Sequence, residues 1–95
     1  MIRHNVVFGL VHAEGSPEEE AFFEAARRLA EIPVVRNFQL FREVNPRNDQ
    51  RFAASMDFAD LDAFRAYSAH PIHDAFRAAH RANMVDVREF DTEPL

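Results

Sequence analysis

The sequence predicts an α+β domain in which four antiparallel strands and two helices follow one another in the order β-α-β-β-α-β. Three observations predict it. Apolar residues alternate in short segments, they recur at helical spacing in two longer ones, and helix-capping residues separate the two kinds. The 95 residues suffice for one domain, residues 1–95, and leave no room for a second.

The first strand is predicted from Ile2 to His12, with apolar side chains on both faces, as in a strand that is covered on two sides. A helix should follow, with Ser16 as its N-cap, Pro17 in its first turn and Glu19 completing a capping box. Pro33 should end this helix. Its predicted buried stripe consists of Phe22, Phe23, Ala26, Leu29 and Ala30.

Two further strands are predicted at residues 34–44 and 51–58, on either side of a loop at 45–49 that is rich in turn-forming residues. In the third strand, alternation places one set of apolar side chains on a single face. These are Phe52, Ala54, Met56 and Phe58.

The second helix is predicted in two pieces. Asp60 is its expected N-cap, and Leu61, Phe64 and Tyr67 form its expected buried stripe. The pair His70-Pro71 should interrupt it, because a residue that precedes proline is pushed out of the helical region. Pro71 then suits the first turn of a new helix. The expected buried residues of that helix are Ile72, Ala75, Phe76 and Ala79.

The last strand is predicted from Met84 to Phe90, before a polar tail at residues 91–95. The complete order is that of a ferredoxin-like fold, with the helices on one face of the sheet. The other face should be partly apolar, through Val7, Val11, Val85 and Val87. An open apolar sheet face, in a chain with 47% hydrophobic residues, predicts a homodimer.

The composition excludes several classes of function. Without cysteine, no disulfide, thiolate metal site or cysteine nucleophile is possible. The net charge of −5 and the scattered arginines argue against nucleic acid or an anionic membrane as a partner. Two glycines cannot form a dinucleotide or phosphate loop, and we expect no cofactor. The first twelve residues hold no apolar run long enough for a signal or a membrane span, so a cytoplasmic location is expected.

RNA-recognition domains share this element order, but their third strand presents aromatic residues to the bases. Here Ala53 and Ser55 stand at those positions. A metal site could be imagined from His70, His73 and His80. The first two span the break before the new helix, and no carboxylate stands at an obvious ligand spacing, so no metal is predicted.

Three polar residues occupy otherwise apolar positions: His4, Tyr67 and His73. His73 falls in the first turn of the last helix, where the helix dipole disfavours the imidazolium ion and favours a neutral ring. A neutral imidazole beside an apolar pocket can serve as a general base. The alternative is structural, since a histidine near a helix start often only bonds a carbonyl and an inward tyrosine is usually a core residue.

Two stretches resemble the stress-responsive A/B barrel (Dabb) family. One is the opening Met1-Ile2-Arg3-His4-Asn5-Val6-Val7-Phe8, a hydrophobic strand that holds a histidine. The other runs from Phe58 to His73 and ends in a His-Pro-x-His motif. The similarity extends over essentially the whole chain, including the Ser-Pro-Glu-Glu helix start and the closing Val85–Phe90 strand.

The resemblance implies a homodimer whose two sheets form a dimeric α/β barrel, with a small apolar cavity between sheet and helices in each subunit. A plant polyketide cyclase of this family performs a cofactor-free aldol cyclisation with two histidines and a tyrosine. By motif, these fall on His4, Tyr67 and His73. Ala26 stands where a bulkier ring is expected, so the substrate should differ. The side chains expected to bind the ligand are Val6, Phe8, Phe22, Phe23, Phe64 and Phe76.

Three functions follow as hypotheses. The first is a protein that binds a small hydrophobic molecule and acts as a cofactor-free acid–base enzyme on an enolisable carbonyl compound, with His73 as base and Tyr67 and His4 orienting the substrate. The second is a non-catalytic stress-response or binding module. The third is a cofactor-free monooxygenase of the antibiotic-biosynthesis type, a family that commonly relies on a tryptophan, which this chain lacks.

Overall fold

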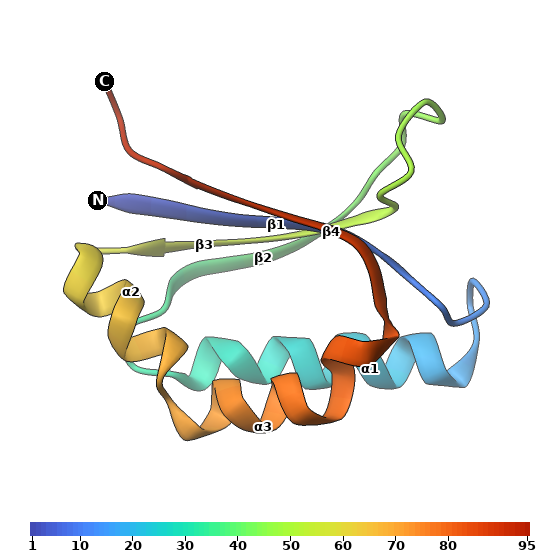
Figure 1. Cartoon of the computed structure of the whole chain (residues 1–95), viewed down its shortest axis with the longest axis horizontal. Helices are drawn as coiled ribbons and strands as arrows, with labels where there is room; N and C mark the ends of the chain where they lie inside the picture. Colours follow the sequence, from blue (N-terminus) through green and yellow to red (C-terminus); the bar gives the residue numbers. More distant parts are fainter.

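Four strands form one antiparallel sheet in the order β2-β3-β1-β4, and the helices lie together on one side of it (Figure 1). The computed structural model describes all residues from 1 to 95. The α+β, ferredoxin-like prediction is confirmed, with helices under one face and nothing over the other. The strands are β1 (Ile2–Leu10), β2 (Arg36–Arg42), β3 (Phe52–Phe58) and β4 (Met84–Thr92).

The first helix, α1 (Pro17–Arg27), begins where the capping residues predicted. The Ser16 hydroxyl accepts a hydrogen bond from the Glu19 backbone N–H at 3.2 Å. The Glu19 carboxylate accepts from the Gly15 N–H at 3.3 Å rather than from the N-cap N–H, so the capping box is displaced by one residue. The α-helix ends before Pro33, and a 3-10 turn, η1 (Arg28–Glu31), continues it.

The second helix is broken as the sequence predicted, into α2 (Leu61–Ser68) and α3 (Pro71–His80). The Asp60 carboxylate caps α2 by accepting from the Ala63 N–H at 2.9 Å. His70 caps α3, because its Nδ1 atom accepts from the Ile72 N–H at 3.1 Å. A short 3-10 turn, η2 (Arg81–Asn83), then leads into β4.

Irregular pairing in the outer strands changes which side chains face inward. Asp86 has a φ of 54°, and the register of β1 against β4 shifts between Val7 and Gly9. Beyond this bulge Val87 packs against the inner core, while Val85 stays on the outer face. The prediction that both valines lie on the open face was therefore wrong for Val87, because strict alternation does not cross a bulge.

The core has two parts. The phenylalanine cluster consists of Phe8, Phe22, Ala26 and Phe52. The tyrosine cluster consists of Ile2, Leu29, Ile32, Met56, Phe58 and Tyr67.

Several helix residues that were predicted to be buried are exposed. Leu61, the first residue of the short helix α2, is 57% exposed. Ala30 is exposed because the 3-10 turn rotates it off the α-helical stripe. Ala75 and Ala79 of α3 are also exposed. None of the helices is long and apolar enough to cross a membrane.

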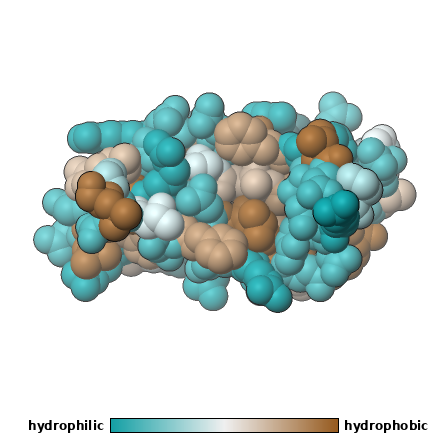
Figure 2. Space-filling view, turned by 90° about the horizontal axis from the view of Figure 1, so that it is seen from above, coloured by the Kyte–Doolittle hydropathy of each residue, from teal (hydrophilic) through white to brown (hydrophobic).

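The outer face of the sheet carries large apolar side chains that no other part of the chain covers. Figure 2 shows apolar residues gathered over the middle of this face between polar ones. Phe41 and Phe90 are 49% and 50% exposed, and Val85 is also exposed. Val11, expected on this face, follows the end of β1 and is exposed.

Candidate functional site

A cavity of about 340 Å³ lies between the inner face of the sheet and the helices. Its volume is within the range of small-molecule pockets. Of the 20 residues that line it, 14 are hydrophobic, so the cavity suits a largely apolar ligand. The remaining lining residues are His4, Ser68, His73, Arg77, Arg81 and Glu89.

His4 reaches the cavity from the inner face of β1 and is only 5% exposed. The register of β1 against β4 places Asp91 opposite it, and the two side chains meet through His4 Nδ1 and Asp91 Oδ1 at 2.5 Å. When His4 donates its Nδ1 hydrogen to this carboxylate, its Nε2 atom is left free as the second functional nitrogen. The Phe64 ring packs edge-on against His4, with centroids 5.0 Å apart, and fixes the imidazole plane.

The partner of His4 was not found from the sequence, which placed Asp91 in a polar tail. The structure extends β4 to Thr92, and Asp91 lies within it. One signal could have found it. In this topology the last strand pairs with the first in antiparallel fashion, so its end must lie beside the start of β1.

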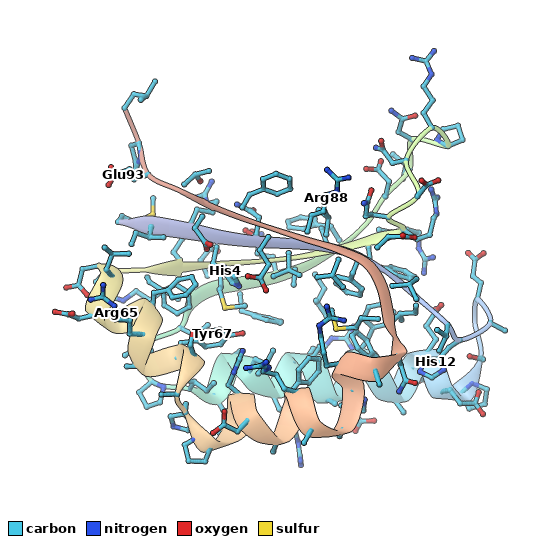
Figure 3. The ribbon with its side chains drawn as sticks, in the orientation of Figure 1. His4, His12, Arg65, Tyr67, Arg88 and Glu93 are labelled. Atoms are coloured by element: carbon cyan, nitrogen blue, oxygen red, sulfur yellow. The ribbon has the colours of Figure 1, made fainter.

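Tyr67 enters the cavity from α2 and is 4% exposed. Figure 3 shows His4 and Tyr67 directed from the sheet and from the helix layer into the same interior space. Burial, and secondly the negative charge of Glu89, raises the pKa of the Tyr67 hydroxyl well above its usual value. Tyr67 is therefore a neutral phenol, able to donate a hydrogen bond, throughout the physiological pH range.

His73 is the third residue of α3, and its ring lies edge-on to Tyr67 with centroids 4.6 Å apart. Its Nδ1 atom is buried and has no hydrogen-bond partner. Burial lowers the pKa of His73, and the charge of Arg77 adds to this effect. The negative charge of Asp74 opposes this effect. The direction agrees with the sequence-based expectation, and burial is the main cause.

These three side chains form a continuous row of rings at one end of the cavity. His4 and Tyr67 are 6.0 Å apart between ring centroids, and Tyr67 bridges to His73. The row combines a neutral imidazole with a neutral phenol beside apolar walls. Such a pair can accept a proton from a bound molecule and donate a hydrogen bond to an oxygen of the same molecule.

The profile of the Stress responsive A/B Barrel Domain (Dabb) family matches residues 2–94, which is nearly the whole chain. This chain is a member of the Dabb family. A Dabb protein of ferredoxin-like fold from Mesorhizobium loti is 41% identical to it, with a TM-score of 0.92, and the match covers 99% of this chain and 96% of that one.

Two more solved structures resemble this Dabb domain. A dimeric ferredoxin-like protein from Thermobifida fusca is 27% identical, with a TM-score of 0.80 over 98% of this chain and 90% of that one. A variant of a cofactor-independent oxygenase from Streptomyces nogalater is 25% identical, with a TM-score of 0.72 over 98% and 91%. No curated protein matches the sequence.

Most of the ligand-binding residues expected for this Dabb domain line the cavity, namely Val6, Phe8, Phe22, Phe64 and Phe76. The exception is Phe23. Its ring packs against Phe52, with centroids 4.8 Å apart, and does not line the cavity. His80, expected to be exposed, is half-buried against Phe22 and Phe76. No group of three or more histidine, aspartate and glutamate side chains is arranged to hold a metal ion.

Reasoning from the sequence did not assign the charged residues of the lining to the site. These are Arg77, Arg81 and Glu89. Arg77 lies four residues after His73, which places both on the same side of α3, and Arg81 follows at the same interval at the start of η2. That spacing could have indicated them. Glu89 could not be placed, because its inward direction depends on the bulge at Asp86.

Proposed function

We propose that this chain, one Dabb domain over residues 1–95, binds a small hydrophobic molecule in the cavity and catalyses a cofactor-free proton transfer on an enolisable carbonyl compound. The observation that carries the proposal is His73, a neutral imidazole with an unpartnered buried nitrogen, set beside Tyr67 at the wall of an apolar cavity. The buried nitrogen of a purely structural histidine would normally have a hydrogen-bond partner.

The proposed step needs no external reagent. The neutral His73 ring carries its hydrogen on Nε2, and the unpartnered Nδ1 removes a proton from the carbon next to the carbonyl. The C–H electrons form a carbon–carbon double bond, and the carbonyl electron pair moves to oxygen. Tyr67 donates a hydrogen bond to that enolate oxygen, and His4, held by Asp91, orients the substrate. In an aldol-type cyclisation the enolate carbon then attacks a second carbonyl, whose oxygen takes the proton back from His73.

Exchange of carbon-bound hydrogen tests the step directly. Benzoylacetone in D₂O, followed by proton NMR, reports removal of the hydrogen between its two carbonyls. We expect the protein to accelerate exchange and His73→Gln to remove at least about a hundredfold of that acceleration. His12→Gln is the matched control, because His12 lies outside the cavity lining, at the opposite end of the molecule from Tyr67 (Figure 3). No acceleration by the wild type would favour the non-catalytic binding module.

A cofactor-free oxygenation is the second candidate, favoured by the likeness to the Streptomyces nogalater oxygenase. Both reactions begin with the same proton removal, and they differ in whether the carbanion then consumes dioxygen. An oxygen electrode in the exchange assay separates them. Oxygen uptake that depends on His73 would replace the aldol assignment with the oxygenase.

The working form is proposed to be a homodimer that joins two outer sheet faces into a barrel. Exposed Phe41, Val85 and Phe90 on that face support it, as does the likeness to the Thermobifida fusca protein, itself described as dimeric. An interface of about 800 Å² per subunit is expected. Phe90→Asp should give a monomer in analytical ultracentrifugation, while Leu61→Asp, at an exposed apolar residue on the helical side, should leave the dimer intact. A monomeric wild type at micromolar concentration would overturn the dimer.

A further inference from the structure

Two arginines border the cavity on the side of α3. Arg77 lies in the last turn of α3, and Arg81 begins η2. They follow His73 at intervals of four residues, and all three side chains line the cavity. A ligand that reaches His73 therefore has guanidinium groups along the same wall.

Neither arginine forms an ion pair within the protein. The four ion pairs of the chain involve Arg3, His4, Arg42 and Arg65, and none includes Arg77 or Arg81. Glu89 is the one acidic residue of the lining, and it projects from β4, where its charge acts on Tyr67. Asp74 shares a shallow outer depression with both arginines but does not line the cavity. The lining thus carries one unbalanced positive charge.

We infer that the cavity of this protein takes an amphipathic carboxylic acid, with its apolar body among the aromatic side chains and its carboxylate on Arg77 and Arg81. A guanidinium group binds a carboxylate through two parallel hydrogen bonds, which a neutral oxygen cannot match. One unbalanced charge fits a monoanion better than a doubly charged phosphate. The inference rests on the proposed binding function and specifies its ligand class.

Binding of such an acid has a consequence at His73. The charges that act on this ring are Arg77, Asp74 and His4, and Arg77 is the largest of them, lowering its pKa. A carboxylate placed on Arg77 offsets that positive charge and raises the pKa of His73. A neutral ligand of the same shape only removes water from the ring, and so lowers the pKa further.

The test compares two probes of nearly equal shape, phenylpentanoate and phenylpentanamide, by isothermal titration calorimetry on the full chain near neutral pH. We expect the acid to bind about tenfold or more tightly than the amide, the gain typical of a charge-assisted hydrogen bond. Arg77→Gln and Arg81→Gln should each reduce that ratio. Arg65→Gln removes the same charge from exposed α2, outside the lining, and should leave the ratio unchanged. Histidine NMR titration should show a higher pKa for His73 with the acid than with the amide.

The outcomes separate this inference from the function on which it rests. Equal binding of the two probes, or an acid preference that survives both arginine substitutions, would overturn the carboxylate inference and leave hydrophobic binding in place. Failure of both probes to bind would overturn the two together. Loss of the preference in Arg65→Gln as well would show a general field effect of the protein charge and would overturn the assignment to Arg77 and Arg81.

Discussion

At the end of the interior that holds the phenylalanine cluster, the buried side chains are all apolar: Phe22 contacts Phe8, with centroids 5.5 Å apart, and also Phe76. At the other end, beside the tyrosine cluster, the row of His4, Tyr67 and His73 replaces part of this packing with polar groups, including a buried His73 nitrogen that has no partner. Both ends lie under the same sheet, but α1 contributes to the phenylalanine cluster and α2 to the tyrosine cluster.

This contrast separates the end that contributes stability from the end that is kept for another purpose. An apolar ring gives its full burial energy, whereas an unpaired buried nitrogen costs free energy that the fold must offset elsewhere. Residues retained despite such a cost are commonly functional. If so, substitutions in the phenylalanine cluster should mainly reduce stability, and substitutions at the polar end should mainly reduce function.

The largest expected effect is in the phenylalanine cluster. Phe22→Ala should lower the free energy of unfolding by about 3–5 kcal/mol, because it removes a ring that is 1% exposed and leaves a cavity at the centre of the cluster. Chemical denaturation measures the change. A loss below about 1 kcal/mol would show that this end is not the stabilising one.

A smaller loss of stability is expected at the polar end, where the His4 side chain has a hydrogen-bond partner. Asp91→Ala should lower the free energy of unfolding by about 1–3 kcal/mol, because it leaves buried His4 without its hydrogen-bond partner. Asp62→Ala is the control, since its ion pair with Arg65 is fully exposed and should contribute little. Equal effects of the two substitutions would mean that the His4–Asp91 pair contributes no more than a surface ion pair.

His73 should behave oppositely to Phe22. His73→Phe replaces the unpartnered imidazole with an apolar ring against Tyr67, so the free energy of unfolding should rise, or fall by no more than about 1 kcal/mol. The same variant should lose proton-exchange activity. A stability loss comparable to that of Phe22→Ala, with activity intact, would make His73 a structural residue and remove the contrast between the two ends.

The pH dependence gives the smallest effect. The pKa of His73 is lower in the folded chain than its ordinary value of about 6.5, so the unfolded chain binds the proton more readily. The contribution of neutral His73 to the free energy of unfolding is complete above about pH 6.5. It decreases as the pH falls from there towards the lowered pKa of the folded chain. Unfolding measured between pH 7 and 5 should show this decrease in the wild type, and a shallower slope in His73→Phe. Identical slopes would contradict the lowered pKa.

The sequence predictions were accurate for features that depend on neighbouring residues and inaccurate for those that depend on strand pairing. The caps at Ser16 and Asp60 and the break at His70-Pro71 depend on neighbouring residues, so the sequence alone predicted them. Periodicity and the motif also brought His4, Tyr67 and His73 to one place. The inward direction of Val87 and Glu89, and the contact of His4 with Asp91, depend on strand pairing and on the bulge at Asp86, which no local pattern encodes.

Helix α3 differs from α1 in how firmly it is held. It contains no buried residue, whereas α1 buries Glu19, Phe22 and Ala26, and α3 has its own cap at His70, separate from α2. A segment that buries little surface and is capped independently can open locally at low free-energy cost while the sheet stays folded. The backbone amides of α3 should therefore exchange with solvent faster than those of α1, and transient opening of this helix would admit a ligand through the wall of the cavity that carries His73.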